Sequence, residues 1–146
     1  MSKRFTLLEA ERLLPEVETL MREAVALKAE YQAAEASLGD LSQRVTMMGG
    51  MVVDRDRVIE NRERRDRSAK QLRETVERIQ DFGCVIKDLE MGLVDFPTLF
   101  RGEEVYLCWK LGEPGISFWH GMQEGFSGRK KIDSEFLDNH QGDLPN

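Results

Sequence analysis

The chain has 146 residues, of which a third are charged, and its formal net charge is −6. That length is enough for one domain with its own hydrophobic core, and the acidic balance argues against nucleic acid or an anionic membrane as the main partner. No apolar run approaches the ~20 residues of a membrane helix. The start, MSKRFTLLEAERLL, is charged too often for a signal peptide, which predicts a cytoplasmic protein with Cys84 and Cys108 as free thiols.

The N-terminal residues predict a short helix followed by a long one. Thr6 and Glu9 have the spacing of a capping box, in which each side chain accepts a hydrogen bond from the other residue's backbone N–H. Pro15 lacks an N–H, so we expect it to end the first helix near Leu13 and to begin a second helix that ends near Leu38. Apolar residues of the second helix alternate at spacings of three and four, which is typical of a seam that faces another helix. They are Val17, Leu20, Ala24, Leu27, Tyr31, Ala34 and Leu38.

A further long helix is expected from about Asp54 to Asp81, before Gly83. Its seam shows the same alternation, with arginines in the middle: Val58, Arg62, Arg65, Ala69, Leu72, Val76 and Ile79. Similar lengths and matching seams predict an antiparallel helical hairpin, similar to a coiled coil, over about residues 6–81. Because two such helices bury only one side each, we expect a second copy to complete a four-helix core in a homodimer.

The loop of the predicted hairpin is unusually apolar. The segment VTMMGGMVV covers residues 45–53 and includes Met47, Met48, Met51 and Val52. Exposed apolar patches commonly mark interfaces, so these four residues are candidates for contacts with another copy or with an unidentified protein partner. The alternative is that the segment folds back onto its own helices.

Short runs rich in β-branched and aromatic residues follow Gly83 and predict an antiparallel sheet of three to four strands, over about residues 84–122. The runs are CVIKDL, LVDF, EVYLCWKL and ISFWHGM. In LVDFP, Pro97 is expected to end an edge strand and Asp95 to point outward. The predicted fold class is therefore α+β, with a single domain over residues 1–132 and a disordered acidic tail over residues 133–146.

Three stretches resemble a known family. They are FTLLEAERLLP at the start, GCVIKDLEMGLVDFP at 83–97 and VYLCWKLGEPGISFWHGMQEGFSGRKKI at 105–132. They are similar to DUF2203, a bacterial and archaeal family of uncharacterised proteins, and the similarity extends over nearly the whole chain. The resemblance implies a bacterial cytosolic origin and a common fold. It implies no activity, cofactor or catalytic residue.

The stretch LCWKLGEPGISFWH, residues 107–120, raises the question of a chemical site. If the chain turns tightly at residues 112–115, Leu107 faces His120 across a hairpin. His120 then lies on the apolar face that the helices cover, where it is expected to pack and to make one hydrogen bond. Cys108 falls on the opposite face. The alternative is that His120 is a ligand-binding or acid–base group.

The remaining chemical candidates are dispersed along the chain. No Cys-x-x-Cys or His-x-x-x-His spacing links Cys84, Cys108, His120 and His140, so we expect no metal and no cofactor. Glycines and basic residues at 120–131 suggest an anion site with Arg129 as a clamp, but the spacing matches no phosphate-binding loop. Asp95 and Glu113 offer carboxylates for acid–base work if they share a cleft.

Two functions follow from these patterns. The favoured interpretation is a non-enzymatic assembly or protein-interaction module that acts through its helix faces and the hairpin tip. The alternative is a small-molecule or anion-binding protein, or an enzyme, with a site between helix ends and sheet. That site would be built from Asp95, Glu113, His120 and Arg129.

Overall fold

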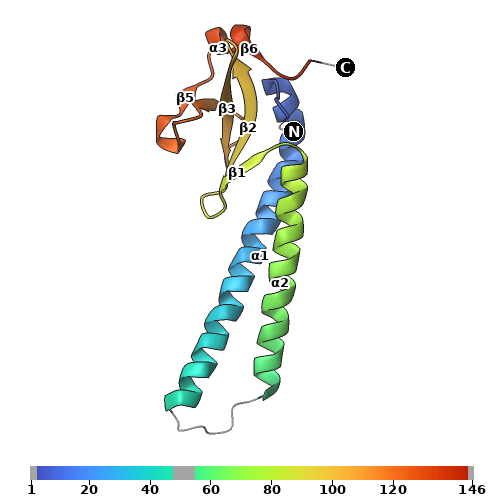
Figure 1. Cartoon of the computed structure of the whole chain (residues 1–146), viewed down its shortest axis with the longest axis vertical. Helices are drawn as coiled ribbons and strands as arrows, with labels where there is room; N and C mark the ends of the chain where they lie inside the picture. Colours follow the sequence, from blue (N-terminus) through green and yellow to red (C-terminus); the bar gives the residue numbers. More distant parts are fainter. Residues whose placement is uncertain (1–2, 48–54, 145–146) are drawn as a thin grey trace. The chain divides into compact units, whose positions relative to one another are not determined.

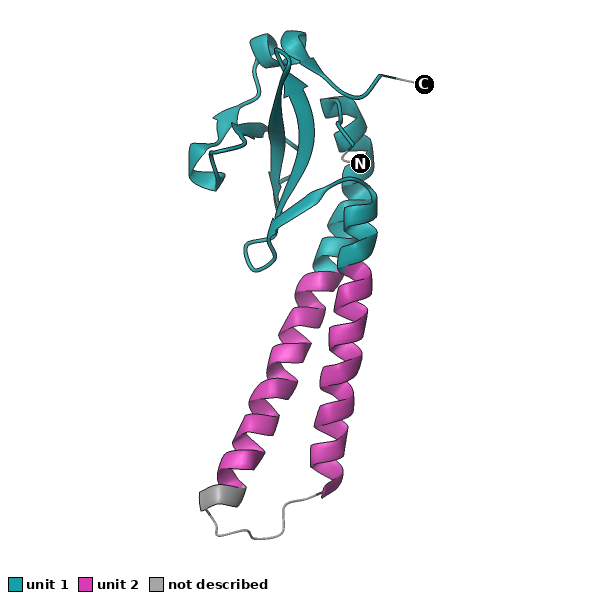
Figure 2. Ribbon diagram, in the orientation of Figure 1, with its two compact units in different colours: residues 1–22, 76–146 teal, residues 23–75 magenta. Residues whose placement is uncertain are grey.

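The computed structural model describes residues 3–47 and 55–144 (Figure 1). It divides into two compact units, one of residues 1–22 and 76–146 and the other of residues 23–75 (Figure 2). In chain order the elements are α1 (Leu7–Met47), α2 (Arg55–Asp81), β1 (Val85–Asp88), β2 (Leu93–Phe100), β3 (Glu103–Lys110), β4 (Phe118–Gly121), a 3₁₀ helix η1 (Phe126–Gly128), β5 (Lys130–Lys131), α3 (Ser134–Asn139) and β6 (His140–Gln141). The predicted α+β class is confirmed, although the described residues form six strands and not three or four.

The start of α1 is fixed by the capping box that the sequence predicts. The Thr6 N–H donates to Glu9 Oε1 at 2.9 Å, and the Glu9 N–H donates to Thr6 Oγ1 at 3.1 Å. The Leu7 N–H is another donor that a helix N-terminus leaves unpaired, and it donates to His140 Nε2 at 3.0 Å. The C-terminal segment is thereby bonded to the first turn of α1.

Pro15 does not end this helix, contrary to the prediction. α1 is continuous over Leu7–Met47 with Pro15 inside it, and it passes the end expected near Leu38. Pro15 is exposed, whereas Leu14 and Val17 on either side of it are buried in one core. We attribute the continuity to the packing of both neighbours, which offsets the one hydrogen bond that proline cannot donate.

Within residues 23–75, α1 and α2 form the predicted antiparallel hairpin. Two ion pairs join the helices: Arg64 Nε lies 3.4 Å from Glu30 Oε1, and Arg65 Nη1 lies 3.7 Å from Glu35 Oε1. The residues buried along the α1 stripe of this unit are Ala24, Leu27, Ala34 and Leu41, and those along α2 are Ser68 and Thr75. The buried positions of α2 in this unit therefore carry hydroxyl side chains and differ from the predicted seam, which placed Val58, Arg62, Arg65, Ala69 and Leu72 there.

The sheet belongs to the first unit, and α1 covers one of its faces. The strand order is β1-β2-β3-β4-β5, with β6 beside β2, and all pairs are antiparallel. One buried core contains side chains from this face of the sheet and from the first turns of α1: Val94, Phe96, Leu107, Trp109, Ala10, Leu14 and Val17. The rings of Phe5 and Phe96 meet edge to face, with centroids 5.5 Å apart.

β2 runs through Pro97 to Phe100, so Pro97 does not end an edge strand. β3 pairs along one edge of β2, while β1 pairs with residues 93–95 and β6 with residues 99–100. Pro97 falls between β1 and β6, and its carbonyl accepts the Phe5 N–H at 2.7 Å. The N–H that proline lacks therefore breaks no pair on that edge. Asp95, which was expected to point outward, is fully buried.

The pairing of β3 with β4 differs by one residue from the prediction. Tyr106 pairs with His120 and Leu107 with Trp119, whereas the sequence analysis set Leu107 opposite His120. A one-residue shift moves every side chain to the other face. His120 is buried, but on the face away from α1, and Cys108 lies on the same face. The prediction that the two residues fall on opposite faces is wrong.

The connection between β3 and β4 explains the shift. The chain turns earlier than expected, over residues 110–113, where the Glu113 N–H donates to the Lys110 carbonyl oxygen at 2.9 Å and Gly112 adopts a φ of 103°. The Glu113 carboxylate also accepts the Lys110 N–H at 2.7 Å. The Ile116 N–H then donates to Glu11 Oε1 of α1 at 3.1 Å and makes no bond to β3. Regular pairing starts only at β4.

Residues 134–141 form a short helix and a strand, in contrast to the disordered tail that was expected over residues 133–146. Asp133 Oδ1 accepts the Phe136 N–H at 2.8 Å and caps α3, and β6 pairs with the end of β2. Phe136 is 1% exposed and stacks on Phe100, with ring centroids 5.0 Å apart. One buried aromatic ring joins this polar segment to the core.

Three of the predicted interface residues, Met48, Met51 and Val52, lie outside the described residues. Of the fourth, Met47, only its place as the last residue of α1 is described. None of the described helices has a stretch that is long and apolar enough to cross a membrane.

Phe136→Ala should lower the free energy of unfolding by about 3–5 kcal/mol, because it removes a fully buried aromatic side chain. Leu137→Ala, at a neighbour that is 45% exposed, is the matched control and should cost less than about 1 kcal/mol. Denaturant melts of the two variants test the packing of α3. Equal stability of Phe136→Ala and the wild type would mean that the segment is a tail after all.

Candidate functional site

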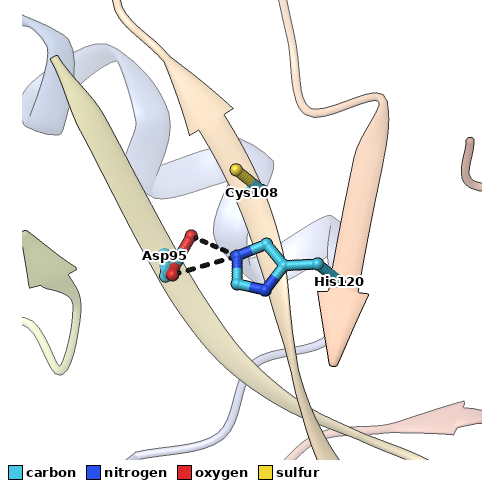
Figure 3. Close-up of side chains that lie close together, drawn as sticks. All are labelled: Asp95, Cys108 and His120. Atoms are coloured by element: carbon cyan, nitrogen blue, oxygen red, sulfur yellow. Dashed lines mark hydrogen bonds and ion pairs between the residues drawn. The ribbon is translucent and has the colours of Figure 1, made fainter. Parts of the chain in front are cut away.

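The central feature of the second sheet face is a buried pair of Asp95 and His120. His120 Nε2 lies 3.1 Å from each Asp95 carboxylate oxygen. The side chains are 1% and 3% exposed, respectively. His120 belongs to β4 and Asp95 to β2, so the imidazole ring reaches across β3 to the carboxylate (Figure 3).

Cys108 of β3 is the third member of this cluster. It pairs with Asp95 across the strands, and its side chain lies beside the imidazole ring (Figure 3). One ligand atom from each of Asp95, Cys108 and His120 lies within 4.8 Å of the other two, and all three residues are buried. Three neighbouring strands therefore contribute one residue each, an oxygen, a sulfur and a nitrogen.

A second hydrogen bond places one proton on the His120 ring. Nδ1 lies 2.8 Å from the Gly121 carbonyl oxygen, and a carbonyl oxygen only accepts, so Nδ1 carries a proton. In the neutral ring Nε2 then has a lone pair, yet it faces two carboxylate oxygens that are also acceptors. A positive species has to reside between them, either a second proton or a metal ion.

Burial dominates the electrostatics of the cluster. It raises the pKa of the Asp95 carboxyl, while the charge and hydrogen bond of His120 act in the opposite direction. It also raises the pKa of the Cys108 thiol to about 12. A nucleophilic cysteine needs a lowered pKa, so the cluster is not built to hold a free thiolate. The positive species between His120 Nε2 and the Asp95 carboxylate, a proton or a metal ion, decides the charge of the cluster.

A small pocket opens above the cluster. Its volume is about 120 Å³, and its lining residues are Lys87, Leu93, Asp95, Cys108, His120, Glu124, Gly125 and Phe126. At about 30 Å³ per water, it has room for about four waters. A wider hollow of about 570 Å³ between Leu7 and Leu137 contains none of the three clustered residues. The small pocket is therefore the place where a ligand would meet the buried polar groups.

Glu113 and Arg129 form the second pair of predicted site residues, and Arg129 contacts Phe126, which lines this pocket. Arg129 Nη2 donates to the two Glu113 carboxylate oxygens at 2.9 and 2.7 Å, and the Arg129 side chain is 9% exposed. It lies 3.9 Å from the Phe118 ring centroid and 4.7 Å from that of Phe126. Glu113 neutralises Arg129, and the guanidinium holds Phe126 in place, while the buried Arg129 Nε–H has no hydrogen-bond partner.

The four predicted site residues thus form two separate pairs, Asp95 with His120 and Glu113 with Arg129. Cys108 lies between them: the charges of Asp95, Arg129 and Glu113 all affect the pKa of its thiol. Cys108 is the candidate that the sequence analysis placed on the wrong face.

One signal in the sequence could have placed Cys108 correctly. Trp109 and Trp119 are the largest apolar side chains of the two strands, and requiring both to lie on the covered face gives the observed pairing. Leu107 then faces Trp119, and Cys108 shares the other face with His120. The expected turn at residues 112–115 led instead to the pairing of Leu107 with His120.

The comparison with known protein families covers the part of the chain that contains the cluster. Residues 3–132 match the family described as "Uncharacterized conserved protein (DUF2203)". The chain belongs to the DUF2203 family. The resemblance expected from the sequence is confirmed, and the match includes Asp95, Cys108 and His120, while α3 and β6 lie beyond it. No curated protein and no solved structure matches this DUF2203 chain.

In this DUF2203 protein, Glu113→Ala should lower the free energy of unfolding by about 2–4 kcal/mol, because it leaves the Arg129 charge buried without its partner. Glu135→Ala is the control. It removes an exposed pair with Arg101 and should cost less than about 1 kcal/mol. Urea melts of the two variants measure both losses, and equal losses would contradict the role given to the buried pair.

Proposed function

We propose that the protein binds one divalent transition metal, best matched by zinc, between Asp95, Cys108 and His120. The observation that carries the proposal is the convergence of three different donor atoms in one buried cluster. It departs from the metal-free protein expected from the sequence. That expectation relied on local motifs, whereas these three residues meet through strand pairing. It is a specific form of the alternative, ligand-binding interpretation.

The donor set supports zinc. Zn²⁺ binds cysteine sulfur, histidine nitrogen and carboxylate oxygen tetrahedrally at about 2.0–2.3 Å, which separates neighbouring ligand atoms by about 3.3–3.6 Å. The 3.1 Å between His120 Nε2 and the Asp95 oxygens is close to that spacing. A sulfur ligand favours zinc over magnesium or calcium, which prefer oxygen.

The surroundings of the cluster support the same assignment. Metal-binding histidines usually donate their other ring N–H to a carbonyl or carboxylate, as His120 does to Gly121. A bound cation would be the positive species that the facing His120 Nε2 and Asp95 oxygens require. It would also allow Cys108 to lose its proton in spite of the burial that raises its pKa, so metal uptake should release a proton.

The chelator-treated protein should bind about one Zn²⁺ per chain in calorimetry and elemental analysis. Asp95→Asn, Cys108→Ser and His120→Gln should each weaken binding by more than about 100-fold, beyond the 10–100-fold typical of outer partners. Co²⁺ in place of zinc should give a thiolate-to-cobalt charge-transfer band that Cys108→Ser abolishes.

The chain contains its own matched controls. It has two cysteines and two histidines, and Cys84 and His140 lie outside the cluster. Cys84→Ala and His140→Gln should therefore leave stoichiometry and affinity unchanged. Absence of Zn²⁺ and Co²⁺ binding to the folded wild type, or equal losses in the controls, would refute the metal site.

A second candidate function is assembly through the helix faces and the hairpin tip. The supporting observation is that the buried stripe of residues 23–75 includes Ala24, Ala34, Ser68 and Thr75, so this hairpin has little hydrophobic core of its own. Ile59 of α2 is also 46% exposed. A second copy packed on the hairpin would cover such surface, giving a homodimer.

Light scattering after size exclusion should give a mass of about twice 16.8 kDa at low micromolar concentration. Ile59→Asp should shift the mass toward that of one chain, because it places a charge in the proposed contact, whereas the exposed neighbour variant Glu60→Gln should not. A single-chain mass for the wild type would contradict the dimer. The measurement is independent of the metal, since chelator treatment should not change the mass.

A further inference from the structure

We infer that the proposed metal site keeps one coordination position open to the pocket, and that this position takes a small anion of the size of acetate. The inference depends on the proposed metal-binding function and adds the class of ligand that the bound metal would accept.

The first argument is the number of ligands that the protein provides. A tetrahedral site needs four, and the cluster found among the described residues provides three. Glu124 is the other carboxylate that lines the pocket. Its Oε1 accepts the Gly121 N–H at 2.9 Å and the Lys130 ammonium at 2.6 Å, so it is held away from the cluster by two bonds. The fourth position is therefore left to a molecule from solution.

The second argument is the size of the space. About 120 Å³ accommodates about four waters, or a ligand of about four non-hydrogen atoms. Phe126 limits this space, and two cations hold its ring: Lys110 Nζ lies 5.4 Å and the Arg129 guanidinium 4.7 Å from the ring centroid. Acetate has four non-hydrogen atoms and azide has three, whereas benzoate has nine.

The third argument is charge. A divalent metal with the Asp95 carboxylate, the Cys108 thiolate and a neutral imidazole has a formal charge of zero. Glu124 and Lys130 neutralise each other. Lys87 lines the pocket as well and adds one positive charge. The remaining positive charge favours an anion over a neutral ligand or a cation.

The experiment uses the full chain loaded with Co²⁺, whose visible d–d bands report changes in coordination. Azide and acetate, titrated separately, should change these bands saturably. Benzoate at the same concentrations should leave them unchanged. In Phe126→Ala, where the pocket is larger, benzoate should change the bands as well.

Lys87→Met tests the charge argument. It should weaken acetate binding to the Co²⁺-saturated protein about three- to tenfold, as expected for one partly screened charge near the ligand. Lys131→Met is the control, since Lys131 is exposed and does not line the small pocket. An unchanged acetate affinity in Lys87→Met would contradict the preference for anions.

The outcomes separate the inference from the proposed function. Co²⁺ binding with bands that neither azide nor acetate changes would show a closed, structural site, which overturns the inference and leaves the metal site intact. Azide binding only in Glu124→Gln would identify Glu124 as the fourth ligand, with the same consequence. Failure of Co²⁺ to bind would reject both.

Discussion

The pairing of β3 with β4 is the constraint on which the rest of the structure depends. A strand presents alternate side chains to its two faces, so the seven residues between these strands decide which set meets α1. The observed pairing directs Trp119 toward the core and His120 away from it. The same choice directs Cys108 toward Asp95. Both the apolar core and the polar cluster follow from this one register.

The polar cluster is difficult to explain by stability alone. A buried carboxylate beside an imidazole and a thiol loses solvation, and a shared proton or a bound cation has to offset that loss. An apolar residue at position 95 would pack beside Cys108 without that loss. The neighbouring Glu113–Arg129 pair, by contrast, joins one guanidinium nitrogen to both carboxylate oxygens and lies against two rings. Of the two pairs, Asp95 and His120 line the pocket.

Local patterns in the sequence predicted what local interactions determine. The capping box of Thr6 and Glu9 and the stripe on α1 depend on neighbours within one or two turns, and so does the α+β order of elements. Pro15 and the C-terminal segment were misjudged because distant packing decides them: Leu14, Val17 and Phe136 contribute to a core assembled from residues far apart in sequence. Asp95 and His120 could be predicted as site residues from the sequence, whereas the place of Cys108 beside them depends on the register of the strands.

The bonds between the ends of the first unit have a consequence for synthesis. The Arg4 N–H donates to Asp143 Oδ2 at 3.0 Å, and the Asp143 N–H donates to the Arg4 carbonyl oxygen at 3.1 Å. The segment before α1 therefore cannot form these hydrogen bonds until residues more than a hundred positions later in the chain have been synthesised. During translation the core around Phe5 and Phe136 stays incomplete until residue 143 has left the ribosome. Phe100 and Trp119, once synthesised, therefore lack the Phe136 ring on which they pack until that segment emerges.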